Sequence, residues 1–105
     1  MITVEVDAGI CGKRATIKAE CQDMQTAHLD ITSDCDHINE MAKKLTEINA
    51  MEEVFGSIGE TRVFQVAREH CEHAACPVPT AIIKAAEAAC GLALPKNVSI
   101  EITKD

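Results

Sequence analysis

The feature that most constrains the fold is a change of hydrophobic period about one third of the way along the chain. Before it, apolar and polar residues alternate in three segments, 2–7, 15–20 and 27–32. Such alternation is typical of strands with one buried face, and the short connections suit antiparallel neighbours. After it, from residue 37 onward, apolar residues recur at helical spacing. The order predicts a three-strand meander followed by helices.

The second part of the chain is expected to hold three to four helices and one last strand. The expected helical ranges are 37–48, 50–55, about 61–70, and 77–90. Pro77 suits a first helical position, and Gly91 suits the residue that follows a helix. Val98, Ile100 and Ile102 alternate with polar residues and predict a C-terminal strand that joins the sheet. We therefore expect one α+β domain, residues 1–105, built as a two-layer sandwich with the helices on one face.

Composition limits the partners. The chain has 17 acidic and 10 basic side chains, a net charge of −7, and only two aromatic residues. Negative charge repels phosphate, and few aromatic rings remain for base stacking, so nucleic acid is not expected as a partner. The longest apolar stretch, 74–94, contains two prolines and two charges, and the N-terminus is patterned as a strand. We expect no membrane span, no signal peptide and a cytoplasmic location.

Six cysteines are the residues best suited to chemistry. In a reducing cytoplasm, thiols remain free or bind metal more often than they form bridges. The meander would place Cys11 and Cys35 at one edge of the sheet, where strand ends meet, and Cys21 at the opposite edge. Cys76 precedes the last helix and Cys90 ends it, about 20 Å away at 1.5 Å per residue. Cys76 and Cys90 therefore cannot share one site.

Four of the six cysteines are expected to converge at the edge where the last helix starts. Cys71 and Cys76 lie in the connection between two helices with C-x₄-C spacing. We expect this connection to reach the edge of the sheet that holds Cys11 and Cys35. Four thiolates bind zinc in a tetrahedron, and they also hold iron–sulfur clusters. The expected ligands are Cys11, Cys35, Cys71 and Cys76. His70 and His73 are candidates to replace a ligand or to hydrogen-bond a sulfur. The alternative is that most of these cysteines are buried as small apolar residues.

A second chemical interpretation concerns Cys76 alone. A thiol at a helix N-terminus faces free backbone N–H groups, which stabilise the thiolate and favour a nucleophile. The segment Cys76-Pro77-Val78-Pro79 resembles the C-P-x-P motif of the TusA family of sulfur carriers. The resemblance implies that Cys76 carries a persulfide and hands it to another protein. On that interpretation Cys76 is the catalytic residue.

Almost the whole chain is similar to an uncharacterised family of short prokaryotic proteins, a domain of unknown function. The resemblance lies in the segments 8–12, 33–35, 71–79 and 91–95. It implies a prokaryotic source and no particular activity.

Enzymatic activity is not favoured by any motif. The glycines at 56 and 59 lack the strand and the Lys-Ser/Thr of a phosphate loop, and no G-x-S-x-G elbow is present. A structural or partner-binding domain is the third function class. Its expected partner is another protein or a second copy, bound through an exposed first-strand or fourth-strand edge.

Overall fold

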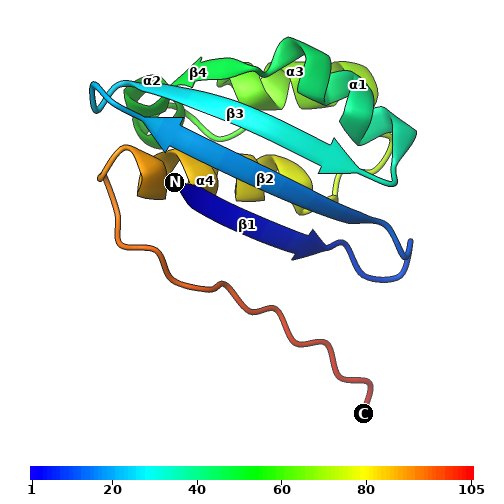
Figure 1. The fold of residues 1–105 in the computed structure, drawn as a ribbon. Helices are drawn as coiled ribbons and strands as arrows, with labels where there is room; N and C mark the ends of the chain where they lie inside the picture. The colour runs from blue at the N-terminus through cyan, green and yellow to red at the C-terminus, as the bar shows by residue number, and fades with distance from the viewer.

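The computed structural model describes all 105 residues and has the α+β architecture that the change of period predicts (Figure 1). A four-stranded antiparallel sheet is accompanied by four helices. In chain order the elements are β1 (Ile2–Asp7), β2 (Arg14–Cys21), β3 (Thr26–Ser33), α1 (Asp36–Lys44), β4 (Glu47–Asn49), α2 (Ala50–Phe55), α3 (Arg62–His70) and α4 (Val78–Ala89). The predicted meander is confirmed in place and direction.

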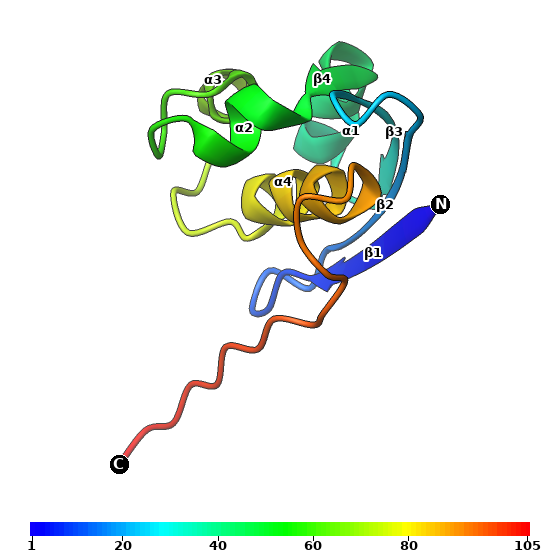
Figure 2. The same cartoon turned by 90° about the vertical axis from the view of Figure 1, so that its left-hand side faces the viewer.

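The sheet has the order β1-β2-β3-β4, and its helices cover one face (Figure 2). Val4 pairs with Ile17, and Ile17 pairs with Ile31, so the inward-facing positions of the three long strands form rows across the sheet. α4 packs on β1 and β2, α1 packs on β3, and α3 packs against both of these helices. Because only one face is covered, the inward residues of β2 and β3 are buried and most outward ones are exposed.

Local polar contacts fix the ends of these elements. Asp23 Oδ1 accepts hydrogen bonds from the backbone N–H groups of Thr26 at 2.7 Å and Gln25 at 3.0 Å, which closes the β2–β3 turn. These two bonds lower the pKa of the Asp23 carboxyl. At the end of α4, Leu92 donates to the carbonyl of Glu87 at 2.9 Å, and Gly91 has φ +75°. This is a Schellman ending, which requires the left-handed conformation that glycine adopts without strain.

The short strand after α1 corrects the prediction of one helix over 37–48, whereas α2 forms at 50–55 as expected. α1 ends at Lys44, and residues 47–49 form β4, which pairs with β3. Leu29 donates a backbone hydrogen bond to Thr46 at 2.8 Å, which draws the chain onto the sheet. Ile48 is buried in the strand, and a helix over 37–48 would also place it in the apolar stripe, so the apolar period alone does not distinguish a helix end from a short strand.

The C-terminal strand predicted at Val98, Ile100 and Ile102 is wrong for this structure. Residues 93–105 form neither helix nor strand, and they extend away from the domain (Figures 1 and 2). The fourth strand of the sheet is β4, on the far side of β3 from β2. An alternating pattern indicates that a segment can form a strand. Whether the segment pairs depends on which edge of the sheet it can reach.

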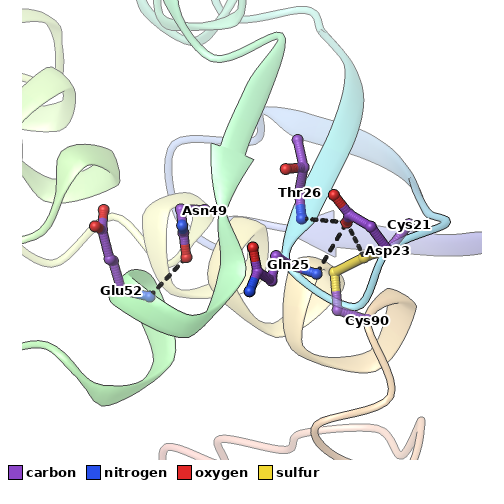
Figure 3. Close-up of a disulfide and its surroundings, with 7 residues drawn as sticks. All are labelled: Cys21, Asp23, Gln25, Thr26, Asn49, Glu52 and Cys90. Atoms are coloured by element: carbon purple, nitrogen blue, oxygen red, sulfur yellow. Dashed lines mark hydrogen bonds between the residues drawn. A yellow bond between two sulfur atoms is a disulfide. The ribbon is translucent and has the colours of Figure 1, made fainter.

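A disulfide joins Cys21 at the end of β2 to Cys90, the residue that ends α4 (Figure 3). The sequence places these two cysteines away from the other four, and that placement is confirmed. The expectation of free thiols is wrong for this pair, because the packing of α4 on β2 brings their Cα atoms to 5.1 Å. No helix combines the length and the apolar character needed to cross a bilayer.

Candidate functional site

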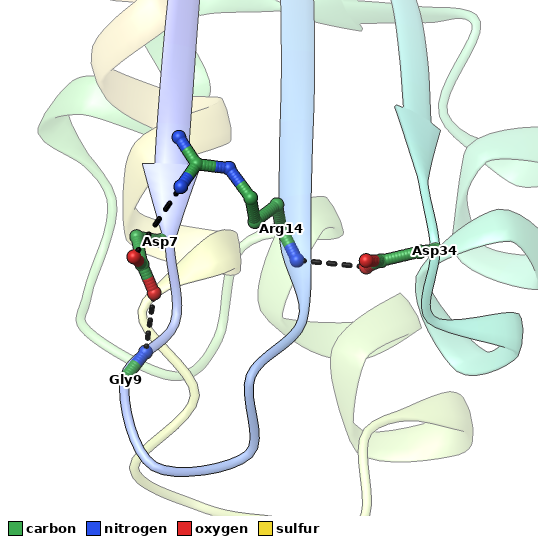
Figure 4. A network of polar contacts seen from close by, with 4 residues as sticks. All are labelled: Asp7, Gly9, Arg14 and Asp34. Atoms are coloured by element: carbon green, nitrogen blue, oxygen red, sulfur yellow. Dashed lines mark hydrogen bonds and ion pairs between the residues drawn. The ribbon is translucent and has the colours of Figure 1, made fainter.

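The end of the sheet opposite the disulfide is held together by a small polar network (Figure 4). The backbone N–H of Arg14 donates to Asp34 Oδ1 at 2.7 Å, and the Arg14 guanidinium lies 3.4 Å from Asp7 Oδ2. Asp7 Oδ1 also accepts from the N–H of Gly9 at 3.1 Å. The network ties the β1–β2 turn to the end of β3, so the segments that carry Cys11 and Cys35 lie at one end of the sheet.

Cys35 occupies the N-cap of α1, where β3 gives way to the helix. Its backbone N–H donates to Ser33 Oγ at 3.0 Å, and its carbonyl accepts from the N–H of Asn39 at 3.1 Å. Asn39 in turn donates its side-chain amide to the Ser33 carbonyl at 2.8 Å. These bonds hold the backbone of Cys35 rigidly while leaving its thiol half-buried and free.

Cys71 and Cys76 lie in the connection between α3 and α4. Cys71 is the C-cap of α3 and donates its N–H to the carbonyl of Ala67 at 2.7 Å. Cys76 donates its N–H to the carbonyl of His73 at 3.2 Å, which curves the connection back on itself. His37 Nε2 lies 3.4 Å from Glu72 Oε1, so the connection is also tied to the first turn of α1. Both thiols are free and half-buried.

Three of the four predicted thiols share one environment. Burial raises the pKa of the Cys71 thiol to about 11, with further contributions from the neighbouring Cys76 and Cys35. Cys71 Sγ also lies 3.4 Å from the thioether sulfur of Met41, a side chain with no exposed surface. Cys35, Cys71, Cys76 and Met41 together form what we call the sulfur cluster. It is rich in soft sulfur donors, and its Cys71 thiol costs free energy to ionise because it is partly buried.

The remaining predicted ligands lie outside this cluster. Cys11 is exposed on the β1–β2 turn and is not among the groups that act on Cys71. His73 is exposed on the α3–α4 connection. His70 lies beside α1, with Nε2 4.0 Å from Glu69 Oε2, and its charge lowers the pKa of Glu40 after the larger effects of Lys43. No three of the His, Cys, Asp and Glu side chains are arranged around a common point as metal ligands.

The chain matches a known protein family. A model of the family of unknown function DUF6951 matches residues 2–102. The chain belongs to the DUF6951 family. No curated protein and no solved structure matches it. The predicted resemblance to a domain of unknown function is therefore confirmed, and the match includes residues 93–102 of the C-terminal segment.

Met41 is the member of the sulfur cluster that sequence reasoning missed in this DUF6951 protein. It falls in the apolar stripe of α1 with Ile38 and Leu45, and all three are buried. Its position in that stripe assigns it to the core. Its contact with a thiol is visible only in the tertiary structure, because the packing of α3 on α1 brings together Cys71 and Met41, which are 30 residues apart in the sequence.

The raised pKa of Cys71 predicts slow alkylation of this thiol in the DUF6951 chain. The thiolate is the reactive form, so a pKa of about 11 in place of 9.0 lowers its population near neutral pH. A difference of this size corresponds to about 100-fold slower reaction with iodoacetamide. Mass-spectrometric mapping of non-reduced samples should show the Cys71 rate still rising between pH 9 and pH 11.

The Cys76→Ser variant separates the effect of burial on the Cys71 pKa from the effect of the neighbouring Cys76 thiol. Burial is the larger one, so removal of the neighbouring thiol should lower the pH midpoint of Cys71 only part of the way. Cys11 serves as the internal reference for reagent loss because it is exposed. A Cys71 rate that already levels off near pH 8 would contradict the burial of this thiol.

Proposed function

We propose that this protein binds a thiophilic metal ion, with zinc as its cofactor, through Cys35, Cys71 and Cys76. The observation that carries the proposal is that Cys76, from the same connection, and Cys35, from a distant segment, both lie near enough to the half-buried Cys71 thiol to raise its pKa. A cation at this point offsets the cost of ionising the Cys71 thiol, because metal binding deprotonates its sulfur ligands.

The local structure supports the proposal in two further ways. Two of the thiols lie on the connection between α3 and α4 rather than within a helix, so bringing them around a common ion requires a change in that connection and not in a helix or strand. The contact between His37 Nε2 in α1 and Glu72 Oε1 joins that connection to the helix that Cys35 caps. Iron–sulfur clusters ordinarily take four cysteines, whereas zinc also accepts three protein ligands with a water or a histidine in the fourth position, which favours zinc over a cluster.

The fourth position is open to several donors. Cys11 lies at the same end of the sheet on an exposed turn, His73 lies on the same connection as two ligands, and water completes many three-ligand zinc sites. Met41 is a weaker donor, and its thioether suits a soft ion such as Cu(I) better than zinc. The identity of the fourth ligand determines whether the site is closed and structural or open.

Metal titration of the full chain tests the proposal. Cobalt(II) added to the metal-free protein should give thiolate charge-transfer and tetrahedral ligand-field absorption at about one ion per chain. Zinc affinity follows from competition with a chromogenic chelator. Because changes next to metal ligands already cost 10–100-fold, Ser at position 35, 71 or 76 should weaken zinc by more than about 100-fold.

The Cys11→Ser variant is the matched comparison, since Cys11 is a free thiol outside the sulfur cluster. An unchanged affinity in this variant fits a three-sulfur site, and an equal loss identifies Cys11 as the fourth ligand. The proposal is wrong if cobalt absorption lacks thiolate bands, or if the three cluster variants bind zinc as tightly as the parent chain.

A sulfur carrier is the second candidate, and the start of α4 is the observation that favours it. Cys76 lies two residues before Val78, the first residue of α4, with Pro77 as the N-cap. This agrees with the position of cysteine in the C-P-x-P motif. A carrier requires Cys76 alone, whereas metal binding requires all three thiols. Persulfide transfer from a cysteine desulfurase that is lost in Cys76→Ser and retained in Cys35→Ser would favour the carrier.

A further inference from the structure

The chain carries both an open sheet edge and a strand-like segment that pairs with nothing. β1 is the outer strand of the sheet, so one side of its backbone has no neighbouring strand. The tail, residues 93–105, runs away from the domain in both views (Figures 1 and 2). Within it, Val98, Ile100 and Ile102 are 60%, 78% and 93% exposed. An open edge and an alternating segment are the two components of strand addition.

The inner face of β1 is incompletely covered in the isolated chain. Its inward residues, Ile2, Val4 and Val6, are only half-buried. Their partners on β2, by contrast, are buried. A strand added outside β1 would extend the apolar rows of the sheet and cover these three side chains. The family match ends at residue 102, so residues 93–102 of the tail lie within the pattern shared by the family.

We propose that residues 97–102 add to β1 of a second copy of the chain, and that the exchange is reciprocal. The side chains favour an antiparallel register in which Ile100 faces Val4. In that register Glu101 faces Thr3 and Ser99 faces Glu5, so no like charges are opposed. A parallel register with Ile100 beside Val4 places Glu101 next to Glu5, and like charges on neighbouring strands are destabilising.

The same chain cannot supply this antiparallel strand to its own β1. The disulfide with Cys21 holds the base of the tail near the start of β1 (Figures 1 and 3). To run antiparallel, the tail would first have to pass the whole length of β1, about 20 Å at 3.3 Å per residue, and then reverse. Residues 91–97 reach at most about 24 Å when fully extended, which leaves only about 4 Å, roughly one residue, for the reversal.

A second copy related by a two-fold axis removes this obstacle. Each copy then contributes one tail and one β1 edge, and both are used, so the assembly closes as a dimer. The swap requires no rearrangement of the domain, because the tail contributes no residue to the buried core. Pro95 lies before the exchanged segment and prevents it from continuing as helix.

Sedimentation of the full, disulfide-bonded chain over a concentration series tests the proposal. The parent chain should sediment as a dimer. Ile100→Asp places a charge in the apolar row and should yield a monomer at the same concentrations. Thr103→Asp adds the same charge to the opposite face of the tail. In the proposed register residue 103 faces Met1, just before the start of β1, so this variant should remain dimeric. A parent chain that is monomeric, or a dimer that survives Ile100→Asp, overturns the proposal.

A peptide identifies the acceptor edge directly. The isotope-labelled Ile100→Asp chain keeps its β1 edge free, so a synthetic peptide of residues 94–105 should shift the amide resonances of Ile2–Asp7. The same peptide with Asp at position 100 is the control and should leave them unchanged. Shifts confined to β4 or the helices overturn the proposal. So does a monomeric parent chain in which its own tail protects β1 from hydrogen exchange.

Discussion

Replacing both disulfide cysteines, Cys21→Ser with Cys90→Ser, is expected to lower the free energy of unfolding by about 4 kcal/mol. The bond joins residues separated by 69 positions, so its loss frees most of the chain in the unfolded state. For a loop of that length, chain entropy gives a value near the upper end of the usual range for one disulfide. Urea unfolding of the oxidised parent and of the double variant measures the difference.

Two controls make this result specific to the bond. Cys11→Ser removes an exposed free thiol and should leave the urea midpoint unchanged. Reduction of the parent chain should reproduce the stability of the double variant, because both have lost the same bond. A loss below about 1 kcal/mol would contradict the entropic argument and would indicate that the reduced chain keeps much of this loop compact when unfolded.

Truncation of Ile17 to alanine is expected to cost about 3 kcal/mol. Ile17 has no exposed surface, lies in the middle of β2 between Val4 and Ile31, and is among the largest fully buried side chains. The cost combines the lost burial with a cavity that the close-packed rows of a sheet cannot fill. Thermal or urea unfolding gives the difference in free energy.

Ile10 provides the matched control because it is fully exposed on the β1–β2 turn. Ile10→Ala makes the same chemical change where no packing is lost, and its effect should stay within about 0.5 kcal/mol. Equal losses in the two variants would show that the rows of the sheet do not carry the core. The comparison therefore tests the architecture and not only one side chain.

Much of the candidate site could be predicted, because strand ends obey simple topology. An antiparallel meander brings the first turn and the end of the third strand to one end, and the connection that precedes α4 arrives there too. Cys35, Cys71 and Cys76 follow that rule. Cys11 reaches the same end of the sheet on a turn. The spacing of residues in the sequence does not determine how far that turn lies from the sulfur cluster. Met41 is indistinguishable in sequence from the other core residues of α1.

By itself, the sequence determined the α+β class, the meander, the starts and ends of most helices, and the separation of Cys21 and Cys90 from the other cysteines. These features depend on the period of apolar residues and on local signals such as Gly91, which act over a few positions. Only the tertiary structure decided that 47–49 pairs as a strand, that 98–102 does not, and that Cys21 meets Cys90. Each of those outcomes depends on which distant segment lies within reach, and a local pattern contains no such distance.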